Sequence, residues 1–79
     1  MSKPNAREVR PAPSGGWDVI NPGGRRVSAH YDKQGDAVVR ARKILSNTGG
    51  GELRVAGRDG AIRQADTIAP GHDSPRRPG

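Results

Sequence analysis

The stretch DKQGDAVVRARKILS, residues 32–46, is the one segment of this chain that is long and periodic enough to predict an α-helix. At 100° per residue its apolar side chains fall in one arc of about 120°. They are Ala37, Val38, Ala41, Ile44 and Leu45. Asp32 is the expected N-cap, and the glycines at 49–51 are expected to end the helix. The stretch therefore predicts a helix that packs one face on a sheet.

The opposite side of this helix is charged, with one exception. The charged side chains are Asp36, Arg40, Arg42 and Lys43. Val39 points outward among them and has no expected contact within the chain. We therefore take Val39 as a candidate interface residue.

A β-hairpin is predicted on each side of the helix. Residues 17–21 and 25–31 form the first, with a turn at Asn-Pro-Gly-Gly (21–24). Residues 52–56 and 61–68 form the second, with a tight turn at Gly-Arg-Asp-Gly (57–60). Alternation points these side chains inward: Trp17, Val19, Val27, Ala29, Tyr31, Leu53, Val55 and Ile62. The expected fold class is α+β in the order β-β-α-β-β, a small antiparallel sheet with one helix on one face.

The apolar residues are concentrated in the middle of the 79-residue chain. It has no Phe, one Trp and one Tyr, but twelve Gly and seven Pro. Of its twelve Val, Ile and Leu, eleven lie between residues 17 and 68. We therefore expect one domain at 16–68, with disordered tails at 1–15 and 69–79. Residues 8–10 could add a short edge strand, because Pro11 and Pro13 would confine it to an edge.

Two motifs resemble a known bacterial family. They are GGWxV at residues 15–19 and GELxVxGRDGxI at residues 51–62, with Ala37 and Ala41-Arg42 in the helix between them. The chain is similar here to the family catalogued as domain of unknown function 2188, over about residues 7–68. It departs from that family at Gln34-Gly35-Asp36-Ala37, where Thr or Ser followed by Glu-Ala is usual. The resemblance implies a small α+β domain and no assigned activity.

The residues of common catalytic and metal sites are missing or scattered. The chain has two histidines and no cysteine, too few ligands for a zinc site. The glycines at 49–51 close a helix, whereas a phosphate-binding loop opens one. We expect no enzyme activity, no cofactor and no small-molecule substrate. With no apolar run long enough to cross a membrane, we expect a soluble cytoplasmic protein with no membrane partner.

The formal net charge of +6 and the pI near 11.1 suggest contact with a polyanion. If the apolar strand faces meet the helix, the other sheet face carries a basic group of side chains. Its expected members, with those of the adjoining turns, are Arg25, Arg26, His30, Arg54, Arg58 and Arg63. The hypothesis is a weak accessory module that binds DNA or RNA without sequence specificity.

The alternative is a module for self-association or protein interaction with no nucleic-acid role. A core this small often needs a partner. Val39 or an uncovered strand edge could pair with a second copy to form a homodimer.

Trp17 could be a buried core residue or a surface residue that stacks on a nucleic-acid base. The scarcity of large apolar residues in the chain favours the core. Trp17→Ala should then cost about 3–5 kcal/mol, nearly the whole stability of a domain this small. Urea unfolding would measure the loss. The native protein should show blue-shifted tryptophan emission, and emission typical of water would place Trp17 on the surface.

Overall fold

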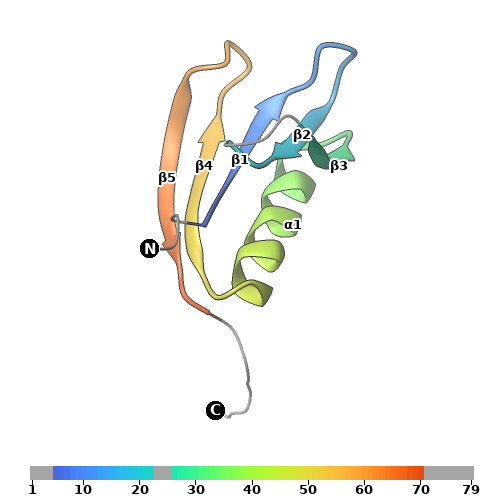
Figure 1. The fold of residues 1–79 in the computed structure, drawn as a ribbon. Helices are drawn as coiled ribbons and strands as arrows, with labels where there is room; N and C mark the ends of the chain where they lie inside the picture. The colour runs from blue at the N-terminus through green and yellow to red at the C-terminus, as the bar shows by residue number, and fades with distance from the viewer. Residues whose placement is uncertain (1–4, 23–25, 71–79) are drawn as a thin grey trace.

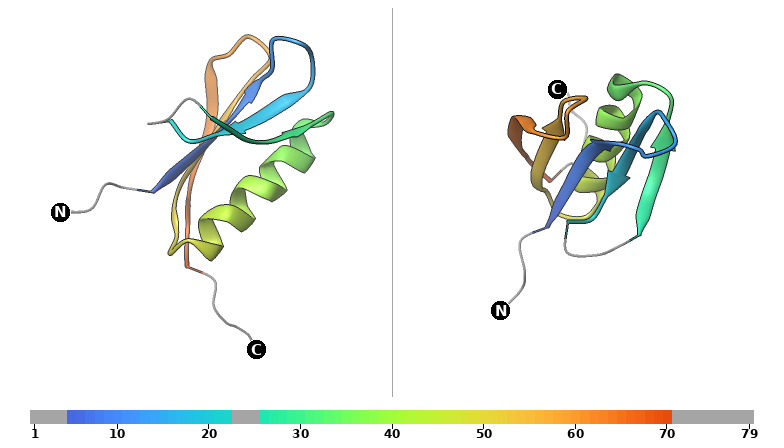
Figure 2. Two further views of the ribbon diagram at one scale, coloured as in Figure 1. Left: turned by 45° about the vertical axis from the view of Figure 1, so that its right-hand side comes forward. Right: turned by 90° about the horizontal axis from the view of Figure 1, so that it is seen from above.

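The computed structural model describes residues 5–22 and 26–70 (Figure 1). Its elements are β1 (Ala6–Pro11), β2 (Trp17–Ile20), β3 (Val27–Tyr31), α1 (Gln34–Asn47), β4 (Gly51–Ala56) and β5 (Ile62–Ile68). The strands form one sheet in the order β3-β2-β1-β4-β5. α1 lies against one face of that sheet (Figure 2). The α+β class is confirmed, with one more strand than the β-β-α-β-β pattern.

β1 is the central strand of the sheet, which corrects the expectation of an edge strand at residues 8–10 within a disordered tail. It pairs antiparallel with β2 and parallel with β4, so it joins the two predicted hairpins. Its pairing with β4 ends at Val9, opposite Val55. Pro11, the last residue of β1, lies beyond that ladder, so its missing N–H removes no bond to β4.

The core lies between α1 and the middle of the sheet. Its buried members are Val9, Trp17, Val19, Ala37, Ala41, Leu45, Leu53 and Val55. The predicted inner face of the helix is confirmed, because Val38 and Ile44 also pack against this cluster. Two alanines at the contact let the helix approach the strands closely.

Val27 and Ile62 were predicted to face inward, but they are 50% and 44% exposed. Each lies next to a β-bulge. The β2–β3 register shifts so that Val27 pairs with Ile20, and the β4–β5 register shifts so that Ile62 pairs with Ala56. One extra residue on the bulged strand resets the alternation of its side chains. The inward pattern is therefore lost at these two strand ends.

The start of α1 differs from the prediction, whereas its end does not. Lys33, with an extended backbone, occupies the N-cap position, and its side chain makes no capping hydrogen bond. Asp32 lies one residue too early to serve as the cap. At the other end Gly49 and Gly50 have φ of 96° and 85°, and the Gly50 N–H donates to the Leu45 carbonyl at 2.7 Å. The glycines therefore end the helix as expected.

Asn5 fastens the start of β1 to the turn between α1 and β4. Its side-chain amide donates to Thr48 Oγ1 at 2.6 Å and to the Gly50 carbonyl at 3.1 Å. Its own carbonyl accepts from the Glu52 N–H at 2.9 Å. A Cβ on Gly51 would collide with that carbonyl. The glycines at 49–51 therefore also allow two backbone segments to approach closely at this point.

The predicted tight turn after β4 is confirmed. The Gly57 N–H donates to the Ala61 carbonyl and the Gly60 N–H to the Gly57 carbonyl, both at 2.9 Å. In the other hairpin, Gly23, Gly24 and Arg25 fall outside the described residues. So do residues 1–4 and 71–79 of the expected tails.

The central position of β1 predicts an asymmetry between two identical substitutions. Val9→Thr places a hydroxyl at a fully buried site and should cost about 1–3 kcal/mol. Val27→Thr, at a half-exposed edge position, should cost less than about 0.5 kcal/mol. Urea unfolding followed by circular dichroism compares them. Equal shifts in midpoint would mean that β1 is not a core strand.

Candidate functional site

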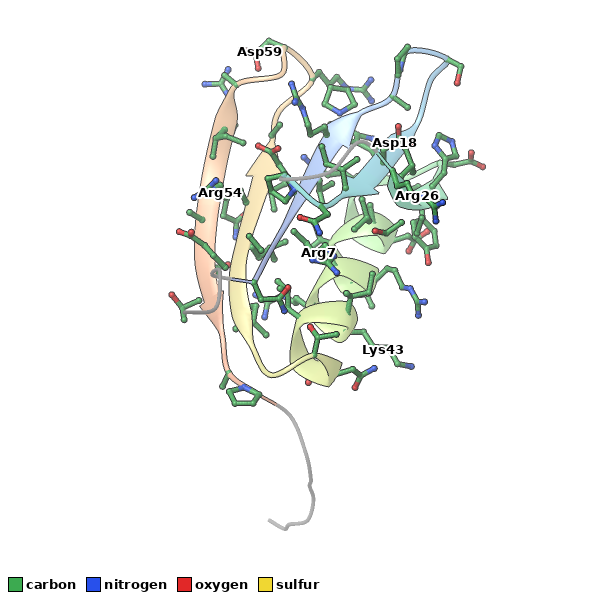
Figure 3. The ribbon with its side chains drawn as sticks, viewed as in Figure 1. Arg7, Asp18, Arg26, Lys43, Arg54 and Asp59 are labelled. Atoms are coloured by element: carbon green, nitrogen blue, oxygen red, sulfur yellow. The ribbon has the colours of Figure 1, made fainter. Side chains whose placement is uncertain are left out.

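The basic cluster predicted on the sheet is spread over both of its edges. Arg26 and His30 belong to the β3 side, whereas Arg63 lies in β5 at the opposite edge. Strands lie about 4.8 Å apart, so β3 and β5 are roughly 19 Å from each other. Figure 3 shows Arg26 and Arg54 on different halves of the sheet. Arg25, a further predicted member, lies outside the described residues.

Three of these predicted side chains are held by carboxylates. His30 Nδ1 lies 2.7 Å from Asp18 Oδ1, Arg54 Nη2 lies 2.9 Å from Glu52 Oε1, and Arg63 Nη2 lies 2.6 Å from Asp59 Oδ2. Glu8 also stands opposite Arg54 in the β1–β4 register. The open face of the sheet therefore alternates in charge.

A different set of cations lies beside the helix. We define the basic track as Lys33, Arg40, Lys43 and Arg58, which line two depressions of the surface. Within residues 5–22 and 26–70, none of the four makes an ion pair. Arg7, Arg10 and Arg26 are likewise outside ion pairs, but they line neither depression.

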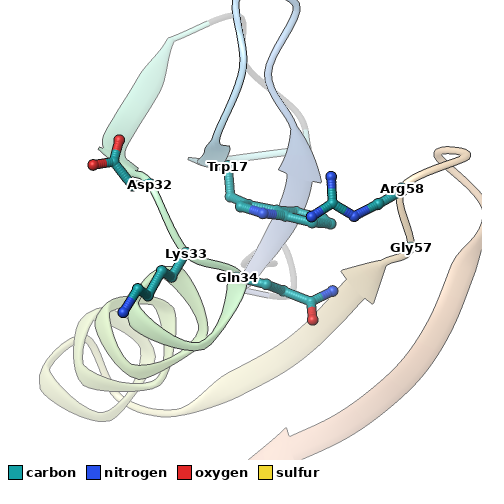
Figure 4. Close-up of a pocket in the computed structure, with 6 residues that line it drawn as sticks. All are labelled: Trp17, Asp32, Lys33, Gln34, Gly57 and Arg58. Atoms are coloured by element: carbon teal, nitrogen blue, oxygen red, sulfur yellow. The ribbon is translucent and has the colours of Figure 1, made fainter.

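The first depression, about 440 Å³, opens where the first turn of α1 meets the end of β4 (Figure 4). Arg58 points toward the indole of Trp17, and Lys33 extends along the helix. Gln34 lines the depression and is held in place by a hydrogen bond from its Nε2 to the Ala56 carbonyl at 3.0 Å. Trp17 is only 6% exposed, which confirms its place in the core. The depression therefore brings one cation, Arg58, to a fixed aromatic ring, whereas the Lys33 ammonium points away from that ring.

The second depression, about 270 Å³, runs between α1 and β3. It is lined by Tyr31, Asp36, Val39, Arg40 and Lys43. Val39 is 66% exposed, as predicted. Tyr31 pairs in register with Trp17, so the only two aromatic residues of the chain are neighbours, one at each depression.

Only Arg58 of the predicted nucleic-acid-binding residues belongs to the basic track. The helical periodicity had already placed Arg40 and Lys43 outward, but their combination with Tyr31 depends on how β3 turns into α1. The acid partners of Arg54 and Arg63 stand two and four residues away in sequence. This short spacing already indicated that acidic side chains would partly neutralise the basic sheet face.

The track has the chemistry of a weak anion-binding surface. Its cations share the depressions with the carboxylates of Asp32 and Asp36, which limits the local positive charge. In the part of the chain that the structure describes, no three His, Asp or Glu side chains gather as metal ligands would. No helix in that part is long and apolar enough to cross a membrane.

Comparison with known proteins identifies the family of this chain. Residues 7–68 match the family described as "Uncharacterized protein conserved in bacteria (DUF2188)". No curated protein and no solved structure matches the chain significantly. The matched range includes all of β2 to β5 and most of β1. The chain therefore belongs to the DUF2188 family of uncharacterised bacterial proteins.

Proposed function

We propose that this protein binds nucleic acid weakly, without sequence preference, through the phosphates that reach the basic track. The observation that carries the proposal is a difference between two groups of cations, those with an acidic partner and those without one. Within the part of the chain that the structure describes, the track cations make no ion pair, whereas Arg54 and Arg63 on the sheet are engaged by neighbouring acids. A free cation can contact a phosphate without first giving up a carboxylate.

The geometry of the track suits a flexible strand. Arg40 and Lys43 lie one helical turn apart, about 4.5 Å along the axis, so they can reach neighbouring phosphates. Tyr31, half-buried beside them, offers a ring edge on which an unpaired base could rest. A depression lined by side chains of both α1 and β3 accepts a single strand more easily than a rigid duplex.

Affinity should be low and sensitive to salt. Asp32 and Asp36 line the same depressions as the track cations and reduce the local positive charge. Phosphate contacts also release counterions, a gain that added salt diminishes. No recognition helix or base-reading side chain is part of this proposal, so it predicts little difference among sequences.

Two matched triple variants test the proposal. The track triple is Lys33→Gln, Arg40→Gln and Lys43→Gln; the sheet triple is Arg26→Gln, Arg54→Gln and Arg63→Gln. Each removes three positive charges from exposed or half-exposed positions. With labelled single-stranded DNA or RNA in an anisotropy titration, the track triple should lower the log–log salt slope by about two, at roughly 0.7 per lost contact. The sheet triple should lower the slope by no more than one such contact, about 0.7, because Arg54 and Arg63 are engaged by acids and only Arg26 of the three is free of ion pairs.

The outcomes separate the alternatives. Equal losses in both triples would mean that only the overall charge matters, and a loss confined to the sheet triple would restore the sheet-face hypothesis. If the unmodified protein does not bind at low salt, where such binding is strongest, the nucleic-acid proposal is wrong. Unchanged thermal unfolding of both triples is the control, because surface changes seldom exceed about 0.5 kcal/mol each.

A further inference from the structure

We propose that β5 is a self-pairing edge, at which a second copy of this chain adds its own β5 antiparallel across a two-fold axis beside Ala65. The two sheets would then form one continuous sheet. The proposal concerns a surface separate from the basic track and does not depend on it.

β5 is the more open of the two edges of the sheet. It is seven residues long, and the residues from Ile62 to Ala65 are exposed. α1 lies over the other strands and leaves β5 at the far side of the sheet (Figure 1). An edge strand presents a row of N–H and carbonyl groups that another strand can pair with. After the bulge near its start, β5 runs in regular register to Ile68, with no lysine or proline to block pairing.

The sequence of β5 is complementary to itself in one register. In an antiparallel pair about a two-fold axis, opposed residues must share a face of the sheet. If the axis passes beside Ala65, the Ala65 residues of the two chains stand opposite each other. Gln64 of each chain then stands opposite Asp66 of the other, which gives two such pairs. Each pair can form an amide-to-carboxylate hydrogen bond. An axis beside Asp66 would instead oppose two carboxylates, which is unfavourable.

The side chains around this seam are compatible with close approach. Within one chain, Asp66 Oδ2 lies 3.4 Å from Arg42 Nη2 of α1 and 3.4 Å from Gln64 Nε2. In the dimer each carboxylate would keep its arginine, and the amide of the opposing Gln64 would replace the amide of its own chain. On the opposite face, Ala65 and Thr67 are small and exposed. The seam is therefore balanced in charge and free of bulk at its centre, which favours a second copy over a partner of fixed charge.

The test is the oligomeric state measured by sedimentation equilibrium from 10 µM to 1 mM. The unmodified chain should associate to a dimer. Ala65→Lys places like charges directly opposite each other and should weaken the dimer about fivefold or more, since opposed like charges destabilise strand pairs. Ser28→Lys adds the same charge to an exposed position of β3, the other edge, and should leave the dimer intact.

A charge-reversal pair tests the register itself. Ala65→Glu alone should also weaken the dimer, whereas an equimolar mixture of Ala65→Lys and Ala65→Glu should regain it as a heterodimer. That recovery would show at the same time that both variants fold. The proposal is overturned if the unmodified chain stays monomeric at 1 mM or if Ala65→Lys and Ser28→Lys weaken the dimer equally. It is also overturned if Val39→Asp abolishes the dimer while Ala65→Lys does not, which would assign the interface to the helix.

Discussion

The burial of Val9 in the middle strand holds the two halves of this fold together. Val9 stands opposite Val19 on one side and opposite Val55 on the other, and all three belong to the cluster beneath α1. Each hairpin can close its own turn, but neither has a core alone. Burying an aliphatic side chain of this size contributes about 1.5–3 kcal/mol, so a row of three across the junction is a large part of the stability of a small domain. Asn5 adds to this junction by bonding to the turn that follows α1.

The width of α1 also determines which surfaces of the sheet stay exposed. A helix is about 10 Å wide, whereas this sheet is roughly 19 Å from edge to edge, so one helix cannot cover all of it. α1 covers the centre, where Ala37 and Ala41 allow close contact with the strands. One flank of α1 then meets β3 and forms a depression lined by free cations, while β5 remains open at the other edge. The two proposed surfaces therefore follow from one packing arrangement.

Local periodicity predicted the parts of the fold that depend on neighbours in sequence. The inner face of α1, the inward Val19, Leu53 and Val55, and the turn at 57–60 are of this kind. β1 could not be placed in the same way, because its parallel partner lies more than forty residues later and its single buried valine gives no alternation. The two bulges, which turn Val27 and Ile62 outward, are also not marked by any pattern in the neighbouring sequence. The predicted basic sheet face rested on the face of each arginine alone, which leaves out the nearby acids that pair with Arg54 and Arg63.

The most direct test of the central place of β1 is a methyl nuclear Overhauser experiment on the native protein. The account predicts cross-peaks from the Val9 methyl groups to the methyl groups of both Val19 and Val55, because the three side chains share one row under the helix. Cross-peaks to Val19 alone would leave β1 as an extension of the first hairpin and would contradict the parallel junction with β4. The absence of both sets would remove β1 from the core altogether.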